Sequence, residues 1–117
     1  MQYAHARSAG ILRKVEESGD VSVIPSQLDP SERSLLLKID YYRQALSEAA
    51  AALSPSVLTT YAFELATAYS DFYEHTPPIV KETDPVIRNF RRALVAAAKA
   101  TLADALNTLG IAAPERI

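Results

Sequence analysis

Aromatic and basic side chains gather at two places in this sequence. Tyr3, His5 and Arg7 lie within the first seven residues, and Tyr69 and Tyr73 stand one helical turn apart much further along the chain. Tyrosine rings and arginine planes stack on the unpaired bases of single-stranded RNA, while basic side chains follow its phosphates. The two groups are therefore candidates for a surface that binds unpaired RNA bases.

The alternative is a structural role, in which the rings close the hydrophobic core and only the hydroxyl groups meet water. Tyr69 and Phe72 fall on an apolar stripe at helical spacing, so we expect them to belong to the core. Tyr3 and Tyr73 lie off that stripe or at its edge. For these two residues, both interpretations stay open.

Other kinds of site have little support. The histidines, His5 and His75, have no partner at metal-ligand spacing, and the chain has no cysteine. No serine lies in a G-x-S-x-G nucleophile elbow, and three glycines are too few for a phosphate-binding loop. We therefore expect neither a metal site nor a catalytic centre, which disfavours an independent enzyme.

The helices that must position these residues can be read from the sequence. Three pairs that place a capping side chain before proline predict helix starts, at Asp29-Pro30, Ser54-Pro55 and Asp84-Pro85. The helix that follows the first pair is expected to continue or to break near Asp40. The expected helices cover residues 2–18, 30–53, 54–74 and about 85–109, with loops at 20–29 and 75–84. The predicted fold is an all-α bundle of four or five helices, formed by residues 1–117 as one domain.

Charge is distributed unevenly along the 117 residues, although the net charge is only −2. Residues 1–15 carry three basic side chains and no acid, and residues 85–117 carry five basic side chains and two acids. Residues 16–84 carry twelve acids and four basic side chains. If the terminal helices lie side by side, an acidic protein has a local positive face. Ordinary solvated helix faces are the alternative.

No apolar run approaches the about 20 residues that a membrane span requires, so no membrane association is expected. The first residues also lack the apolar segment of a secretory signal. The absence of cysteine is compatible with a reducing, cytoplasmic setting.

Several motifs give a more specific indication when they are taken together. QYAHAR and ILRK occupy residues 2–14, FYEH occupies residues 72–75, and the chain ends in LGIAAPERI. In this order and spacing, the chain resembles the C-terminal DALR anticodon-binding domain of arginyl-tRNA synthetases over essentially its whole length. The resemblance implies an all-helical domain that grips the anticodon stem and loop of arginine tRNA, in the service of ATP-dependent tRNA arginylation.

The resemblance also implies site residues. Tyr3 of QYAHAR, Tyr73 of FYEH and the terminal Ile117 would lie against the anticodon loop. Ile117 replaces the methionine that usually ends the family's chains, and Ser8 stands where the motif is usually apolar. The loop after FYEH also departs from the family, so how residues 76–84 meet RNA stays open.

Basic side chains extend this candidate site. As an extension of the residues that the resemblance implies, we expect Arg7 to contact a phosphate or a base. Arg91 and Arg92 are weaker candidates for contacts with the RNA backbone.

The catalytic signatures of this synthetase class, HIGH and KMSK, do not occur in these residues. We therefore expect a C-terminal piece of arginine–tRNA ligase that is inactive alone, whether excised or a stand-alone relative. Its expected partners are arginine tRNA and the catalytic domain, and ATP and magnesium would belong to that missing domain. The alternative is a stand-alone helical module for protein–protein interaction. A common exposed face for Tyr3, Arg7, Tyr73 and Ile117 would favour RNA binding.

Overall fold

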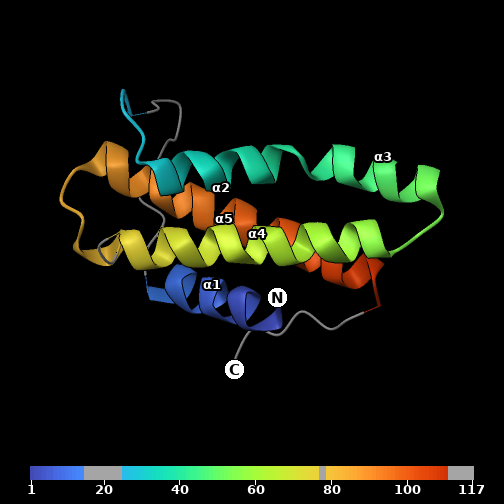
Figure 1. Ribbon diagram of the computed structural model, residues 1–117. Coiled ribbons are helices and arrows are strands. Elements are labelled where there is room, and N and C mark those ends of the chain that lie inside the picture. Colours follow the sequence, from blue (N-terminus) through green and yellow to red (C-terminus); the bar gives the residue numbers. More distant parts are fainter. Residues whose placement is uncertain (15–24, 77–78, 111–117) are drawn as a thin grey trace.

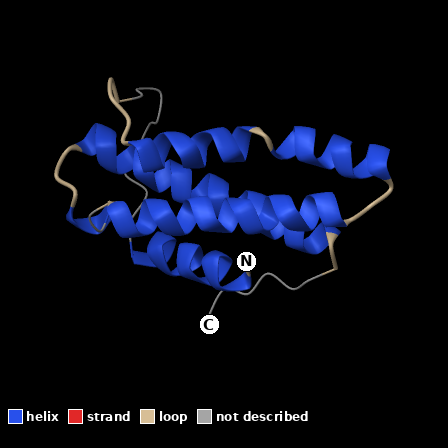
Figure 2. Ribbon diagram, in the orientation of Figure 1, coloured by secondary structure: helices blue, strands red, loops and turns tan. Residues whose placement is uncertain are grey.

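The computed structural model describes residues 1–14, 25–76 and 79–110, and every regular element in them is helical (Figures 1 and 2). The predicted all-α fold is therefore confirmed. The elements are α1 (Gln2–Lys14), α2 (Pro30–Asp40), α3 (Tyr42–Ala52), α4 (Ser56–His75), the short 3-10 helix η1 (Ile79–Lys81) and α5 (Pro85–Thr108).

The two long helices, α4 and α5, form the centre of the bundle (Figure 1). α2 and α3 follow one another along α4, and α2 also packs against α5. α1 lies on the other side, mainly against α5 and in contact with α4. This packing brings the first helix of the chain to the second half of the sequence.

The helix boundaries follow local signals. Asp84 precedes Pro85, and its carboxylate accepts a hydrogen bond from the backbone N–H of Val86 at 2.9 Å. α2 ends at Asp40, so of the two possibilities left open by the sequence, the helix breaks there. α3 ends at Leu53, which adopts a left-handed backbone conformation with φ of 51°.

Two boundaries differ from the prediction or cannot be compared with it. The first helix is described only to Lys14, and its expected extension to residue 18 lies outside the described residues. The predicted loop at 75–84 contains η1, which is a single turn that the proline-rich sequence conceals.

The core is formed by the apolar stripes that the spacing predicts. The apolar stripe of α4 is buried throughout, at Leu58, Tyr61, Ala62, Leu65, Tyr69 and Phe72. The stripe that continues along α5 is buried at Phe90, Leu94, Ala98, Leu102 and Ala105. It is only partly buried at its two ends, Ile87 and Leu109, the latter just beyond the helix. Small residues on α1, such as Ala4 and Ala9, are also buried and contribute little side-chain bulk at the helix surface that packs on the bundle.

Candidate nucleic-acid interface

Three of the predicted site residues meet on the surface between α1 and the C-terminal end of α4. The guanidinium of Arg7 lies over the ring of Tyr3, 4.7 Å from its centroid, and over the ring of Tyr73, 4.1 Å from its centroid. Arg7 Nη2 also donates a hydrogen bond of 2.9 Å to the Tyr3 hydroxyl. Tyr3 is 53% exposed and Tyr73 is 41% exposed, so the cluster is open to solvent. We call Tyr3, Arg7 and Tyr73 the aromatic cluster.

Helical geometry explains why these side chains meet. Tyr3 and Arg7 are four residues apart and therefore share one face of α1. His5, which the sequence grouped with them, is buried on another face of α1. Ser8 is also fully buried, and its hydroxyl donates to the backbone carbonyl of Ala4 at 2.8 Å. A polar residue at this position is thus satisfied within the helix.

Tyr69 lies beside the aromatic cluster, in the core of the bundle. It is fully buried, and its ring centroid lies 6.5 Å from that of Tyr73, which is one turn further along α4. Burial raises the pKa of Tyr69 to about 12, although the Ser8 hydroxyl and the charge of Arg7 oppose the rise. The Tyr69 hydroxyl has no hydrogen-bond partner of ordinary geometry among the described residues. The core role expected for Tyr69 from its spacing is therefore what the structure shows.

Arg91 lies in a different environment. Its side chain is only 8% exposed, and its guanidinium is surrounded by three carboxylates. Nε donates to Glu32 at 3.2 Å, Nη2 donates to Asp29 at 3.3 Å, and Nη1 lies 3.5 Å from Glu82. We call Arg91 and these three acids the ion cluster. It joins α5 to α2, to the residue that precedes α2 and to the loop before α5, which makes Arg91 a structural residue of the bundle.

The sequence contained a signal for this role that the charge count obscured. Arg91 stands three residues before Leu94 and seven before Ala98, so it lies on the buried stripe of α5. Arg92, the next residue, is only partly buried and lies away from that stripe. Ile117 lies outside the described residues. The aromatic cluster therefore contains three of the six predicted site residues.

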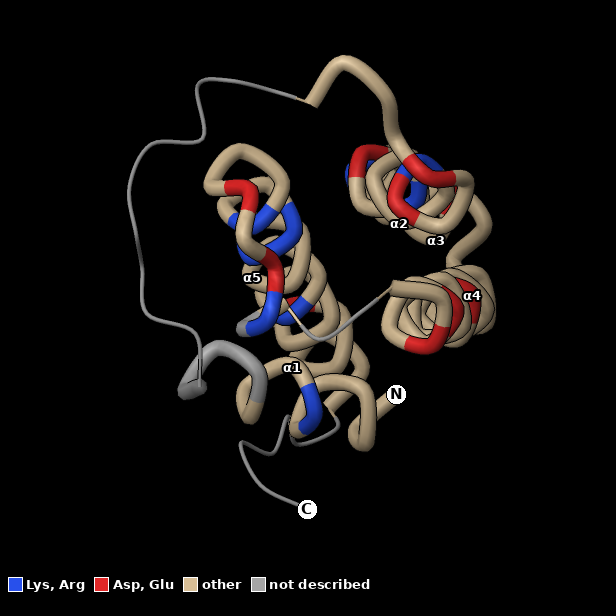
Figure 3. The backbone as a smooth tube through the Cα atoms, turned by 90° about the vertical axis from the view of Figure 1, so that its left-hand side faces the viewer, with Lys and Arg blue, Asp and Glu red and all other residues tan. Residues whose placement is uncertain are grey.

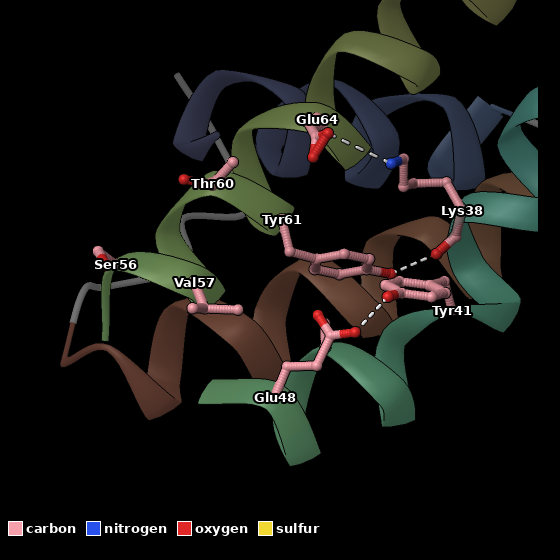
Figure 4. Close-up of a pocket in the computed structure, with 9 residues that line it drawn as sticks. Lys38, Tyr41, Glu48, Ser56, Val57, Thr60, Tyr61 and Glu64 are labelled. Atoms are coloured by element: carbon pink, nitrogen blue, oxygen red, sulfur yellow. Dashed lines mark hydrogen bonds and ion pairs between the residues drawn. The ribbon is translucent and has the colours of Figure 1, made fainter. Parts of the chain in front are cut away.

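A groove lies nearer the other end of α4. It has a volume of about 380 Å³ and runs between α4 and the junction of α2 with α3 (Figure 4). The residues that line it include Lys38, Tyr41, Glu48, Tyr61 and Glu64. Its polar groups already satisfy one another. Tyr41 donates to Glu48 and Tyr61 donates to the backbone carbonyl of Lys38, each at 2.5 Å, and the Lys38 ammonium lies 3.5 Å from Glu64.

This groove is also remote from the aromatic cluster. Twelve residues of α4 separate Tyr61 from Tyr73, which corresponds to roughly 18 Å along the helix axis. The groove is bordered by two carboxylates, and these disfavour an RNA phosphate. Of the two surfaces, the aromatic cluster has the chemistry that suits RNA.

The helices of the bundle differ in charge. Lys and Arg are concentrated on α5, and α1 carries Arg7, whereas α4 carries acids and neither Lys nor Arg (Figure 3). Within the described parts of the chain, no group of three or more acidic, histidine or cysteine side chains could hold a metal ion. None of the described helices is long and apolar enough to cross a membrane.

Comparisons with known proteins place this arrangement in a family. The family model described as the DALR anticodon binding domain matches residues 1–117. An arginine–tRNA ligase from Frankia casuarinae is 44% identical over all of this chain, and one from Methanosarcina barkeri is 42% identical over 98% of it. These alignments cover only 20% and 21% of the two relatives.

A solved structure, Thermus thermophilus arginyl-tRNA synthetase, matches with a TM-score of 0.90 and 37% identity. The match covers 99% of this chain and 20% of the synthetase. The chain thus spans about a fifth of the length of the relatives that it matches. The resemblance drawn from QYAHAR, FYEH and the terminal PERI is confirmed, and the chain belongs to the DALR anticodon-binding domain family of arginyl-tRNA synthetases.

Proposed function

We propose that this domain binds the anticodon stem and loop of arginine tRNA and that the aromatic cluster contacts unpaired bases of the loop. The observation that carries the proposal is the convergence of Tyr3, Arg7 and Tyr73, from helices far apart in sequence, on one exposed surface. Two exposed tyrosine rings and a guanidinium are the groups that hold splayed bases in RNA complexes.

The family and its relatives supply the context of this binding. We propose that the domain serves ATP-dependent arginylation of tRNA in the cytoplasm, with the catalytic domain of a synthetase as its protein partner. ATP and magnesium belong to that catalytic domain, and this chain takes no cofactor. The proposed division of labour leaves recognition of the anticodon to the aromatic cluster.

The proposal can be tested with a labelled RNA hairpin that carries the anticodon stem and loop of arginine tRNA. Tyr3→Ala and Tyr73→Ala should each weaken binding about 5- to 150-fold, which is the usual contribution of one base stack. Tyr41→Ala is the matched control, because Tyr41 is another exposed tyrosine but borders the remote groove. Thermal unfolding of each variant verifies that it remains folded.

Salt and loop sequence provide the decisive comparison. Binding should weaken as salt rises, because each phosphate contact on a single strand releases about 0.7 counterions. A hairpin with an altered loop sequence should bind less tightly than the arginine hairpin. Absence of binding at low salt, or equal affinity for both loops, would contradict the proposed function.

A further inference from the structure

Arg7 covers one face of each tyrosine ring in the aromatic cluster. Its guanidinium lies over both Tyr3 and Tyr73, at 4.7 and 4.1 Å from the ring centroids. The ring of buried Tyr69 also lies beside the Tyr73 ring, with 6.5 Å between the two centroids. In the free protein, the faces of Tyr3 and Tyr73 that point towards each other's helix are therefore shared by one guanidinium, and a base that stacks there has to displace it.

Building on the proposed function, we propose that Arg7 is a displaceable cover. In the RNA-free domain, its guanidinium shields the faces of Tyr3 and Tyr73 from water. When the anticodon loop binds, Arg7 leaves these faces to an unpaired base and moves to an RNA phosphate. One side chain thus has two positions, and RNA selects the second.

The contacts of Arg7 suit it to such a movement. Its described partners are two exposed rings and the hydroxyl of Tyr3, and no ion pair joins it to a carboxylate of the described residues. No acid of the described residues therefore pairs with its positive charge, and a phosphate offers a stronger, charge-assisted hydrogen bond than a neutral hydroxyl does. Arg91 shows the opposite case, because three carboxylates hold its guanidinium inside the bundle.

The rings that Arg7 would vacate are held in place by other contacts. Tyr73 lies against Tyr69, which is fully buried, and Tyr3 stands on the helix whose opposite face packs on α5. A stacking surface that keeps its shape after Arg7 departs is preorganised for a base, so little ordering has to accompany binding.

Nuclear magnetic resonance of the arginine Nε–H groups can follow the movement directly, with the Arg7 signal assigned from its loss in Arg7→Lys. In the free domain, ring currents of the two tyrosines should shift this signal upfield, and Tyr73→Leu should reduce that shift. Saturation with the arginine anticodon hairpin should abolish the upfield shift in the unsubstituted domain. A shift that persists in the saturated complex would overturn the cover, because the base would then stack elsewhere or on Arg7 itself.

Affinity measurements with Arg7→Ala give an independent test. Two hairpins are compared, one with an intact loop and one with an abasic position in the loop. If Arg7 is a cover, the ratio of the two affinities in Arg7→Ala should equal or exceed that of the unsubstituted domain, while the salt slope falls by about 0.7. If Arg7 is itself the stacking platform, the ratio should fall as it does in Tyr73→Ala. If the intact hairpin binds at low salt but the affinity ratio is reduced in Arg7→Ala, only the proposed role of Arg7 as a cover is refuted. If the unsubstituted domain binds no hairpin at all, the proposed function is refuted as well.

Discussion

Replacement of Arg91 by methionine tests whether this arginine holds the bundle together or contacts RNA. Methionine keeps much of the apolar stem of the side chain but removes the guanidinium from Asp29, Glu32 and Glu82. The Glu32 side chain is only 4% exposed, so its carboxylate would remain in the interior without its counter-ion. The variant therefore leaves a buried charge unpaired.

The size of the effect follows from that buried charge. Breaking a buried ion pair by removing one partner costs about 3–5 kcal/mol. Asp29 is 56% exposed and adds little, because surface pairs contribute about 0–1 kcal/mol. A domain of this size has about 5–15 kcal/mol of stability in total. We therefore expect Arg91→Met to lower the free energy of unfolding by about 3 kcal/mol and the Tm by roughly 10 °C.

Urea unfolding, monitored by circular dichroism, measures this loss. Arg43→Met is the matched control, because Arg43 is an exposed arginine on α3 and its replacement should change stability by less than about 0.5 kcal/mol. The double variant Arg91→Met with Glu32→Met should recover part of the loss, because it removes the stranded carboxylate together with its partner.

RNA binding at a temperature where Arg91→Met stays folded separates the two roles. The affinity for the anticodon hairpin and its salt slope should match those of the unsubstituted domain. A stability loss below about 1 kcal/mol, or a salt slope reduced by one phosphate contact, would refute the structural role that we assign to Arg91.

Two further substitutions test the fold, one beside the aromatic cluster and one at the end of α3. Tyr69→Phe removes a buried hydroxyl without an ordinary partner, so stability near neutral pH should stay equal or rise by about 1 kcal/mol. The pKa of Tyr69 is about 12 in the folded domain, above the usual 10, so the folded state keeps this proton to a higher pH than the unfolded state does. The contribution of the protonated hydroxyl to stability is therefore complete below about pH 10 and is lost as the pH rises towards 12. Urea unfolding over that range should show a smaller loss of stability in Tyr69→Phe than in the unsubstituted domain. Leu53 has a left-handed backbone conformation, and its side chain is 93% exposed. Leu53→Gly should therefore raise the free energy of unfolding by about 1 kcal/mol, and with it the Tm, whereas Leu53→Ala should not.

Much of the fold could be predicted from the sequence because its signals are local. A capping residue followed by proline fixes a helix start through the first-turn hydrogen bonds, as at Asp84-Pro85. The apolar stripe of α4 correctly predicted that Tyr69 and Phe72 are buried. By contrast, η1 is a single turn between prolines, and three residues are too few to produce a periodic pattern.

The candidate site was less predictable, because it depends on tertiary contacts. Arg7 and Tyr73 are 66 positions apart, and only the packing of α1 beside α4 and α5 places one over the other. Spacing within α1 could pair Tyr3 with Arg7 but could not tell that Arg7 covers a second ring. Counting charges could not show that Arg91 forms ion pairs with Asp29 and two other acids. Each arginine had the same sequence-level charge, and its environment decided its role.

The different environments of the arginines explain how a domain with a net charge of −2 can present the RNA-binding surface that we propose. The ion cluster pairs Arg91 with three acids, of which Glu32 is buried, so Arg91 adds no free positive charge to the surface. Arg7 contacts two rings and forms no ion pair with an acid of the described residues. In the movement that we propose, this cation serves both the phosphate and the base, because its transfer to the phosphate uncovers the stacking face for the base. Recognition of this kind depends on where a few side chains lie and what holds them, and hardly at all on the net charge of the protein.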